Sequence, residues 1–296
     1  MSHPTDYPTD VRIAVIGGSG LYAMSDLADT TRHEISTPFG DPSDAITVGT
    51  LAGRRVAFLP RHGAGHRLSP SLVPARANMF ALKLLGVRVV ISVSAVGSLR
   101  EDLAPTHLAL PDQIYDRTVS RPRTFFDAPG LVAHVSLAEP FCPILRGLLA
   151  DGAEAAGATV HRQGGTYICI EGPRFSTKAE SRTYRALGFD VIGMTAMPEA
   201  QLAREAEMRY AVLACVTDYD VWHEGEEPVS VEMVVQYLQR NVAVAQATLR
   251  HVVPRLDTDA DDPTYHALAG AIMTDPARVP PALRARLAPL VGAYLP

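Results

Sequence analysis

Apolar and polar residues alternate along the chain in a pattern that predicts strands and helices in turn. Short apolar runs bounded by Gly, Pro or polar residues are typical of buried strands, and they occur at residues 12–16, 45–48, 56–59, 87–93, 166–171, 191–194 and 210–217. Helical periodicity with start and stop signals predicts helices at about residues 74–85, 143–156, 178–187, 199–209 and 231–252. This alternation favours an α/β fold with a largely parallel central sheet flanked by helices.

Length and composition indicate a single globular unit. The chain has 296 residues, 47% of them hydrophobic, which is enough to bury a substantial core. We expect a flexible N-terminus over residues 1–10, the main domain over 11–254 and a C-terminal extension over 255–296. The extension begins with an acidic linker near 257–263, and its apolar residues predict either a packed appendage or a helix pair that faces a partner.

Charge and cysteine content exclude several classes of protein. The net charge is −5 and no basic run is present, so we expect no nucleic-acid partner. Cys142, Cys169 and Cys215 lie far apart in apolar contexts, which favours reduced core thiols over a disulfide or metal site; Cys142 as a nucleophile is the weaker alternative. The N-terminus has no apolar signal region, and no stretch approaches the roughly 20 apolar residues of a membrane span. These features predict a cytoplasmic protein.

Two aspartates close the apolar run at residues 210–217. Asp218 and Asp220 stand on either side of Tyr219, at the carboxyl end of a predicted strand, where open α/β sheets bind ligands. Alternation along a strand would turn both carboxylates to the same side, and their repulsion would raise the pKa of one of them. An acid beside an acceptor suits a 6-aminopurine. The alternative is that the two residues only cap the following turn.

A glycine-rich loop follows the first predicted strand. Residues 18–23 read Gly-Ser-Gly-Leu-Tyr-Ala, which fits the dinucleotide fingerprint of oxidoreductases. The amphipathic helix and the second strand with its acidic residue, which the fingerprint also requires, are not evident in the polar stretch 24–36. We therefore favour an anion-binding loop in which the Ser19 hydroxyl adds a donor; a plain glycine turn is the alternative.

Other anion donors follow other predicted strands. Arg61 and His62 come at the end of the strand at 56–59, residues 94–98 form a second loop rich in small and hydroxyl residues, and Met194-Thr195 forms a third. None of these is specific by itself, but together they predict one anion site at the carboxyl ends of the strands. The chain lacks the sequence motifs of nucleotide-phosphate loops, zinc proteases and Mg²⁺ sites, so we expect the anion to be inorganic phosphate.

Several ordered motifs resemble the 5′-methylthioadenosine phosphorylases, within the trimeric purine nucleoside phosphorylase family. The motifs are Ile-Gly-Gly-Ser-Gly-Leu (16–21), Leu-Pro-Arg-His-Gly (59–63), Ala-Val-Gly-Ser-Leu-Arg (95–100), Ala-Glu-Pro-Phe-Cys-Pro (138–143), Ile-Glu-Gly-Pro-Arg-Phe-Ser-Thr (170–177), Gly-Met-Thr-Ala-Met-Pro-Glu (193–199) and Thr-Asp-Tyr-Asp-Val-Trp (217–222). The resemblance covers residues 12–253. It implies a nucleoside phosphorylase α/β fold with a central mixed β-sheet, phosphate as co-substrate, no metal or organic cofactor, and a homotrimer with sites at the subunit borders.

The resemblance also implies a role for individual residues. Phosphate binding falls to Ser19, Arg61, His62, Ser94 and Thr195. Base and ribose binding falls to Ala95, Val96, Gly97, Phe175, Met194, Asp218 and Asp220, with the two aspartates reading adenine and supplying the acid. The wall around the 5′ substituent comprises Val231, Val234 and Val235, together with His134 lent by the neighbouring subunit. Gly193 stands where many members have asparagine.

The implied reaction is phosphate-dependent cleavage of 5′-methylthioadenosine, or of a related 5′-deoxy-5′-substituted adenosine, to adenine and a 5-substituted ribose 1-phosphate. A proton from the Asp218/Asp220 pair would go to N7 of the leaving base. Alternatives are a phosphorylase of 5′-fluoro- or 5′-chloro-5′-deoxyadenosine, an NAD-dependent oxidoreductase based on the loop at Gly18, and a nucleoside-binding protein without catalytic activity.

Overall fold

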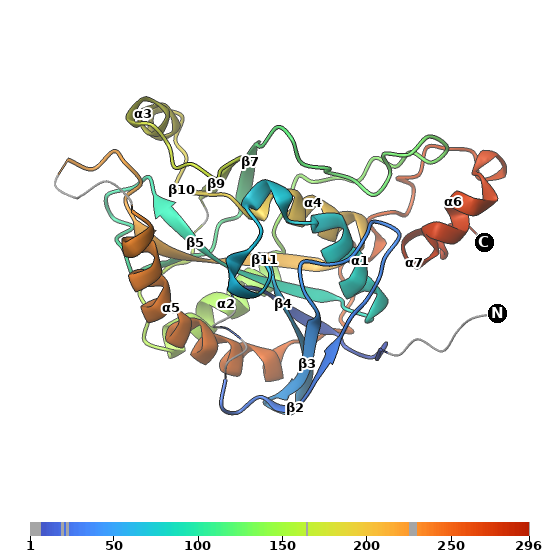
Figure 1. The fold of residues 1–296 in the computed structure, drawn as a ribbon, viewed down its shortest axis with the longest axis horizontal. Coiled ribbons are helices and arrows are strands. Elements are labelled where there is room, and N and C mark those ends of the chain that lie inside the picture. Colours follow the sequence, from blue (N-terminus) through green and yellow to red (C-terminus); the bar gives the residue numbers. More distant parts are fainter. Residues whose placement is uncertain (1–6, 19–20, 22–23, 164, 225–229, 296) are drawn as a thin grey trace.

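The strands of the described residues form one mixed sheet (Figure 1). The computed structural model describes residues 7–18, 21, 24–163, 165–224 and 230–295, without the side chains of 233, 236 and 238–240. The strands are β1 (Ile13–Gly17), β2 (Ala28–His33), β3 (Ile46–Leu51), β4 (Arg54–Pro60), β5 (Val89–Ser98), β6 (Leu108–Ala109), β7 (Gln113–Arg117), β8 (Val160–His161), β9 (Thr166–Ile170), β10 (Val191–Gly193) and β11 (Arg209–Asp218).

The sheet confirms the expected α/β architecture and places β5 at a branch point. Strands β4, β1, β5 and β11 run parallel in the centre, whereas β3 pairs antiparallel with β4, and β2 pairs antiparallel with β3 at the edge. Near its carboxyl end β5 also pairs with β10, antiparallel, through Gly97 and Ser98. From there the sheet continues through β9 to β7. The branch brings the ends of β5, β10 and β11 together.

Helices cover both faces of the central strands (Figure 1). They are α1 (Ala75–Leu84), α2 (Pro143–Ala155), α3 (Lys178–Ala186), α4 (Ala196–Glu205), α5 (Val231–Val252), α6 (Pro281–Arg286) and α7 (Ala288–Val291). Because side chains alternate along a strand, Ile13 and Val15 of β1 pack with α2 and α5, whereas Ala14 and Ile16 pack with α1 and α4. The near-continuous apolar runs in these strands follow from burial on both faces.

Two predicted boundaries are wrong. Residues 94–98, predicted as a loop, continue β5, because Gly97 pairs with both Ile192 and Asp218. The helix predicted at 199–209 spans Ala196–Glu205 instead. Its predicted last residue, Arg209, begins β11 and pairs with Val89.

Strands β2, β6, β7 and β8 were not predicted. The residues of β2 are almost all exposed, so this edge strand carries no apolar pattern. Strand β7 lies in the polar stretch 112–130, and β6 and β8 have only two residues each. By contrast, α2 and α5 match their predicted ranges to within one residue.

The C-terminal extension packs against the main domain. Leu268, Leu287 and Leu290 are buried in the same apolar cluster as α1 and α4, which favours the packed appendage over a helix pair that faces a partner. The acidic stretch 257–263 is not a free linker, because the buried Asp262 carboxylate lies 2.9 Å from the guanidinium of buried Arg209. The last two helices, α6 and α7, lie at one end of the molecule beside α1 (Figure 1).

Two further predictions can be compared with the structure. The three cysteines are buried and free, as expected for core thiols. Over the described part of the chain, no helix is long and apolar enough to span a membrane.

Candidate active site

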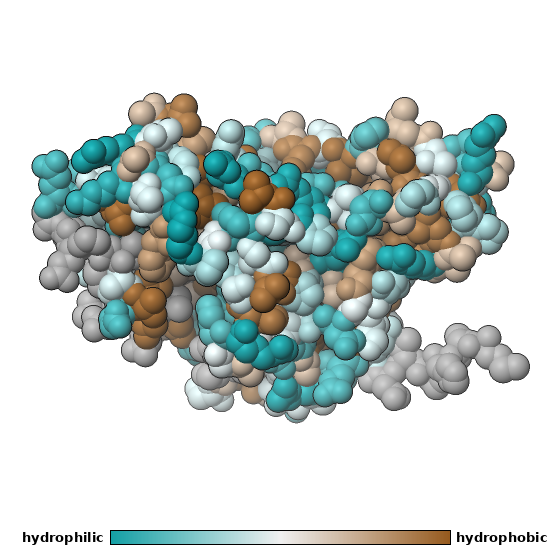
Figure 2. Space-filling view, turned by 45° about the horizontal axis from the view of Figure 1, so that its top comes forward, coloured by the Kyte–Doolittle hydropathy of each residue, from teal (hydrophilic) through white to brown (hydrophobic). Residues whose placement is uncertain are grey.

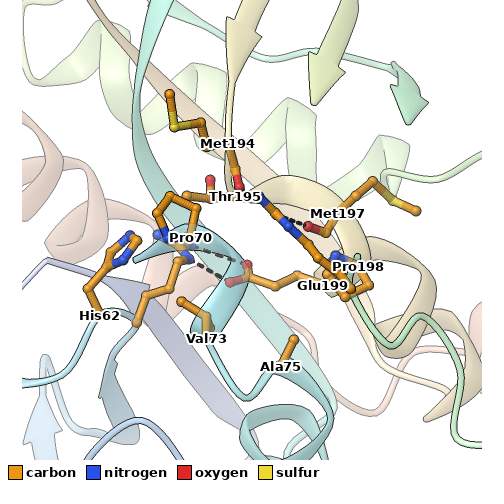
Figure 3. A pocket seen from close by; sticks show the side chains of 11 residues that line it. His62, Pro70, Val73, Ala75, Met194, Thr195, Met197, Pro198 and Glu199 are labelled. Carbon is orange, nitrogen blue, oxygen red and sulfur yellow. Dashed lines mark hydrogen bonds and ion pairs between the residues drawn. The ribbon is translucent and has the colours of Figure 1, made fainter. Parts of the chain in front are cut away.

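A small cleft lies where the ends of β4 and β10 meet the start of α4 (Figure 3). It is lined by Arg61, His62, Pro70, Val73, Ala75, Arg121, Met194, Thr195, Met197, Pro198 and Glu199. Four residues predicted from the sequence, Arg61, His62, Met194 and Thr195, are therefore brought together. The cleft combines cationic and hydroxyl groups with apolar walls, as small-molecule sites do.

Arg61 is the most constrained cation of the cleft. Its side chain is 3% exposed and pairs with Glu199, with 2.5 Å between Nε and Oε1 and 3.2 Å between Nη2 and Oε2. Nη2 also donates to Ser92 Oγ, and Nη1 donates to the carbonyl of Val93. A guanidinium has five N–H donors, so one N–H of Nη1 has no partner among the described residues. Arg61 can thus offer one donor to an anion while Glu199 holds its plane.

His62 is held as a neutral ring with one nitrogen free for a ligand. Its Nδ1 lies 2.9 Å from the carbonyl of Leu68, so Nδ1 carries the proton and donates. Burial, reinforced by the charge of Arg61, lowers the pKa of His62 to about 4. Nε2 can therefore accept a hydrogen bond from a protonated phosphate oxygen, or take up a proton when a dianion binds.

Hydroxyl groups complete the anion end. Ser94 follows Ser92 on the same face of β5, and its buried Oγ has no hydrogen-bond partner among the described residues. Such an unsatisfied hydroxyl is costly without a ligand or water. Thr195 precedes α4, and its Oγ1 lies 3.5 Å from the hydroxyl of Tyr167. Ser19, the remaining predicted phosphate residue, lies outside the described residues.

Asp218 is the last residue of β11 and is buried. Its Oδ2 accepts from Thr217 Oγ1 at 2.7 Å, and its Oδ1 accepts from the backbone N–H of Asp220 at 2.8 Å. Burial raises the pKa of Asp218 to about 6; the hydrogen bonds from Thr217 and Asp220 oppose the shift, and the charge of Asp220 is the smallest contribution. The predicted perturbation is present, but burial and not repulsion between the carboxylates is its main cause.

Asp220 lies in the turn after the strand. Its φ of 53° is left-handed, so the turn, and not strand alternation, brings the two carboxyls together. Burial raises the pKa of Asp220, and Oδ2 has no hydrogen-bond partner among the described residues. Asp218 does cap the turn, as the alternative interpretation of the pair as a turn cap holds. Yet both aspartates are buried and have raised pKa values, which a cap does not require.

The residues predicted to hold the base lie beside this pair. A Cβ added to Gly97 would lie 2.8 Å from Asp218 Oδ1 and 3.4 Å from Asp220 Cβ, so glycine leaves room there. Ala95 and Val96 precede Gly97 in β5. Phe175 is 37% exposed, which leaves part of its ring available for stacking. Met194 lines the anion cleft, and its Sδ packs against Gly172, where an added Cβ would lie 2.5 Å away.

The predicted 5′ wall is not assembled within the single chain. Val231 and Val235 are exposed and Val234 is half-buried, all in the first turns of α5. Asn241 Nδ2 donates to the carbonyl of Val216, so these turns extend past the carboxyl end of β11. His134 is exposed beside the C-terminal extension, where its backbone N–H donates to the carbonyl of Ala271, and it does not line the cleft of its own chain.

Three cleft or near-cleft residues were not predicted as site residues. Glu199 is buried and holds Arg61; Arg121 is buried and reaches five protein acceptors; Tyr167 lies under Thr195. A charged residue within an apolar motif, as Glu199 is in Met-Pro-Glu, is the signal that could have identified Glu199.

A Cβ on Gly193 would lie 1.9 Å from the Tyr167 hydroxyl, so no side chain fits at position 193.

Within the described residues, no group of three or more His, Cys, Asp or Glu side chains could hold a metal ion.

Comparison with known proteins identifies the family. Residues 12–254 match the model of the phosphorylase superfamily, so the chain belongs to that superfamily. It is 59% identical to S-methyl-5′-thioadenosine phosphorylase of Chloroflexus aurantiacus over 283 residues, 95% of this chain and 98% of the relative. It is 53% identical to S-methyl-5′-thioadenosine phosphorylase of Gloeobacter violaceus over 292 residues, 97% of each chain.

Solved structures agree with these relatives. A methylthioadenosine phosphorylase from an antarctic soil metagenomic library has a TM-score of 0.90 and 47% identity, covering 95% of this chain and 99% of that one. Methylthioadenosine phosphorylase from Schistosoma mansoni in complex with adenine has a TM-score of 0.82 and 35% identity, covering 89% and 98%. Membership of the superfamily contradicts the oxidoreductase alternative; most of the glycine-rich loop on which that alternative depended lies outside the described residues.

Proposed function

We propose that this protein is a purine nucleoside phosphorylase that cleaves 5′-methylthioadenosine with inorganic phosphate, releasing adenine and 5-methylthioribose 1-phosphate. The observation that carries the proposal is that an anion-binding cleft and a buried acid occur in the same site. Arg61, His62 and Thr195 line an anion cleft, and Asp218, with a pKa raised to about 6, ends a strand that runs parallel to β5, the strand that carries Ser94. The relatives with S-methyl-5′-thioadenosine phosphorylase names cover nearly the whole chain.

Phosphate acts as both nucleophile and electrostatic stabiliser. The free N–H of Arg61, the Ser94 hydroxyl and Thr195 donate to its oxygens, while Nε2 of His62 accepts from a protonated oxygen. One phosphate oxygen attacks C1′ as the bond to the base lengthens. The remaining negative charge faces the positive charge that develops on the ribosyl group, and this lowers the barrier.

The base end handles the leaving group. As the glycosidic bond breaks, electrons move into the imidazole ring of adenine, and a protonated carboxyl of the Asp218/Asp220 pair donates to N7. The raised pKa keeps Asp218 partly protonated near pH 6. The other carboxylate accepts from the exocyclic amine, which favours adenine over a 6-oxopurine. Phe175 packs on the ring and Met194 lies under the ribose.

The proposal includes a homotrimer in the cytoplasm, with a role in purine and methionine salvage. The exposed first turns of α5 and the position of His134 support assembly, because the 5′ wall then needs a neighbouring subunit to enclose it. Apolar side chains on the surface offer an interface: Figure 2 shows them as patches among hydrophilic residues, and Leu72, Val119 and Phe175 are among the exposed ones. Sedimentation equilibrium should give three chains of 31.8 kDa.

The direct test is adenine release from 5′-methylthioadenosine with and without phosphate. We expect release that depends on phosphate; no release from any 5′-substituted adenosine would contradict the proposal. Comparing kcat/KM for methylthio, fluoro, chloro and hydroxyl substituents then defines the 5′ group, because an apolar wall should discriminate against the hydroxyl. A lower value for methylthio than for the halogens would favour a halo-nucleoside phosphorylase.

A further inference from the structure

We infer that Arg121 is a positioning residue that aims the backbone of the anion cleft, and that it does not bind the anion itself. The inference rests on the proposed function and extends it. Arg121 lies in the segment between β7 and α2 and lines the cleft, where an arginine would ordinarily be assigned to phosphate. Its hydrogen bonds indicate a different role.

All five N–H donors of Arg121 are directed at protein oxygens. Nη1 donates to the carbonyls of Met194 and Met197, both at 2.6 Å. Nη2 donates to the carbonyl of Glu171 at 2.7 Å and to that of Ile170 at 3.3 Å. Nε lies 3.4 Å from Glu171 Oε1. A guanidinium has five such donors, so none remains for a ligand, whereas Arg61 keeps one.

Four of these acceptors are backbone carbonyls from two segments that carry site residues. Ile170 ends β9 and Glu171 follows it, on the segment that leads to Phe175, whereas Met194 and Met197 flank the start of α4. The carbonyl of Met197 needs an external donor, because this residue has φ −110° and ψ 135° and departs from the helix. Arg121 therefore fixes the distance between the segment before Phe175 and the turn that carries Met194 and Thr195.

The hydrogen bonds of Arg121 also orient one peptide toward the anion. In a trans peptide the C=O and N–H point in opposite directions, so binding the Met194 carbonyl turns the N–H of Thr195 away from Arg121. Among the described residues, that N–H meets only the Tyr167 hydroxyl, at 3.5 Å, a distance too long to satisfy it fully. It can donate to phosphate. The guanidinium charge at the opposite end of the peptide polarises this donor.

The carboxylate of Glu171 holds the Arg121 side chain and the backbone before it in place. It accepts from Ser71 Oγ and from the backbone N–H groups of Val119 and Ser120, besides Nε of Arg121. Burial raises the pKa of Glu171, but these hydrogen bonds outweigh it and lower the pKa to about 2, so the carboxylate stays ionised. Glu171 thus binds both the backbone of residues 119–120 and the guanidinium of Arg121.

The test compares Arg121→Met and Arg121→Lys with the matched control Arg123→Met. Arg123 is two residues away and 42% exposed, and its partners, Asp116 and Thr118, do not line the cleft. Measured are kcat, the KM for phosphate and for 5′-methylthioadenosine, the Kd of inorganic phosphate by calorimetry, the Kd of adenine, and the melting temperature. Calorimetry with phosphate needs no turnover, so it reports on Arg121 even if the wild-type protein fails to cleave the nucleoside.

We expect Arg121→Met to raise the Kd and KM for phosphate at least tenfold and to lower kcat about tenfold, while the Kd of adenine stays within threefold. Arg121→Lys keeps the charge but not the planar array of five donors, so its phosphate affinity should lie between those of the wild type and Arg121→Met. Arg123→Met should match the wild type. A phosphate Kd within twofold of wild type in folded Arg121→Met would overturn the inference. So would an equal loss of phosphate and adenine binding, which indicates a purely structural role. If Arg121→Met does not fold, Arg121→Lys and Glu171→Gln are measured instead, and an unchanged phosphate Kd in both overturns it equally.

Discussion

At the residue scale, Asp218 combines a structural and a chemical role. Its carboxyl caps the turn through the N–H of Asp220 and is also buried enough to raise its pKa to about 6. Asparagine keeps the cap, because its Oδ1 accepts from Asp220 and its Nδ2 can donate to Thr217 Oγ1. The Thr217 proton, which Asp218 accepts in the wild type, can then go to the carbonyl of Val96 at 3.3 Å. Asp218→Asn therefore removes the acid with little change in shape.

We expect Asp218→Asn to lower kcat/KM for 5′-methylthioadenosine by about 10²–10⁴-fold, the usual contribution of a general acid. Activity toward a 6-oxopurine nucleoside should fall less, because the amide N–H that is not donated to Thr217 can bridge N7 and the adjacent 6-oxo group. Steady-state kinetics with both substrates checks this. Unchanged activity and selectivity would sink the assignment of the acid.

The same variant should change how stability depends on pH. The pKa of Asp218 in the folded state, about 6, exceeds its ordinary value of 3.8. The unfolded state therefore releases the proton first, and the wild type loses stability as the pH rises between these two values. Removing the carboxyl should raise the free energy of unfolding of the ligand-free protein by about 3 kcal/mol above pH 7 and by about half of that at pH 5. Urea unfolding at both pH values measures the difference; an equal gain at both would rule out titration as its cause.

At the element scale, Gly193 shows how tightly β9 and β10 are packed. Gly193 pairs with Cys169, and the Tyr167 side chain from β9 fills the space in front of it. A methyl group there would lie 1.9 Å from the phenol oxygen and 2.6 Å from the ring carbon that bears it. Because Tyr167 is fully buried, the ring can move only by displacing Thr195 or its neighbours.

We expect Gly193→Ala to cost roughly 1–3 kcal/mol of stability, the usual effect of overpacking, and to raise the KM for phosphate through the displaced Thr195. Adding Tyr167→Phe removes the phenol oxygen, the closest atom, and should restore part of the lost stability and lower the KM for phosphate again. A double-mutant cycle on the urea unfolding free energies measures the coupling. If the two changes are additive, the proposed clash is absent.

The elements also show what the sequence could predict. Apolar runs and capping signals located the central strands and the helices α2 and α5 to within a few residues, because burial on both faces leaves a clear pattern. The exposed edge strand β2 has no such pattern, and residues 94–98 read as a loop because serine and glycine hid the pairing with β10. Pairing partners lie far away in the sequence, so local composition cannot reveal them.

The site shows the same limit. The motifs located Arg61, His62 and Thr195, which do line one cleft. They did not reveal Arg121, because its role depends on four carbonyls from two distant segments and no local pattern records them. The sequence also suggested repulsion as the cause of a raised pKa in one of the two aspartates, whereas burial, which only the fold creates, is the largest cause of the raised pKa of Asp218.

At the scale of the whole molecule, the C-terminal extension and the main domain share one core. Leu268, Leu287 and Val291 are buried with residues of α1 and α4, and Tyr294 donates to Glu207, which lies between α4 and β11. The junction depends on the buried ion pair between Asp262 and Arg209, with Arg209 also donating to the carbonyls of Asp257 and Ala260. The extension is therefore part of the folding unit, beyond the range that the superfamily model matches.

Asp262→Ala should destabilise the whole protein and not the extension alone. Its carboxylate is 7% exposed and faces Arg209, at 3% exposed, so alanine leaves a buried cation without its counter-charge at a cost of roughly 3–5 kcal/mol. The neighbouring Asp261→Ala is the matched control, because that side chain is 94% exposed and its contact with His266 is a surface pair worth about 0–1 kcal/mol. Because the extension shares its core with α1 and α4, we expect one cooperative unfolding transition in both variants, shifted to lower urea only in Asp262→Ala. A separate early transition, with the main domain unfolding at the wild-type midpoint, would instead show that the extension folds independently.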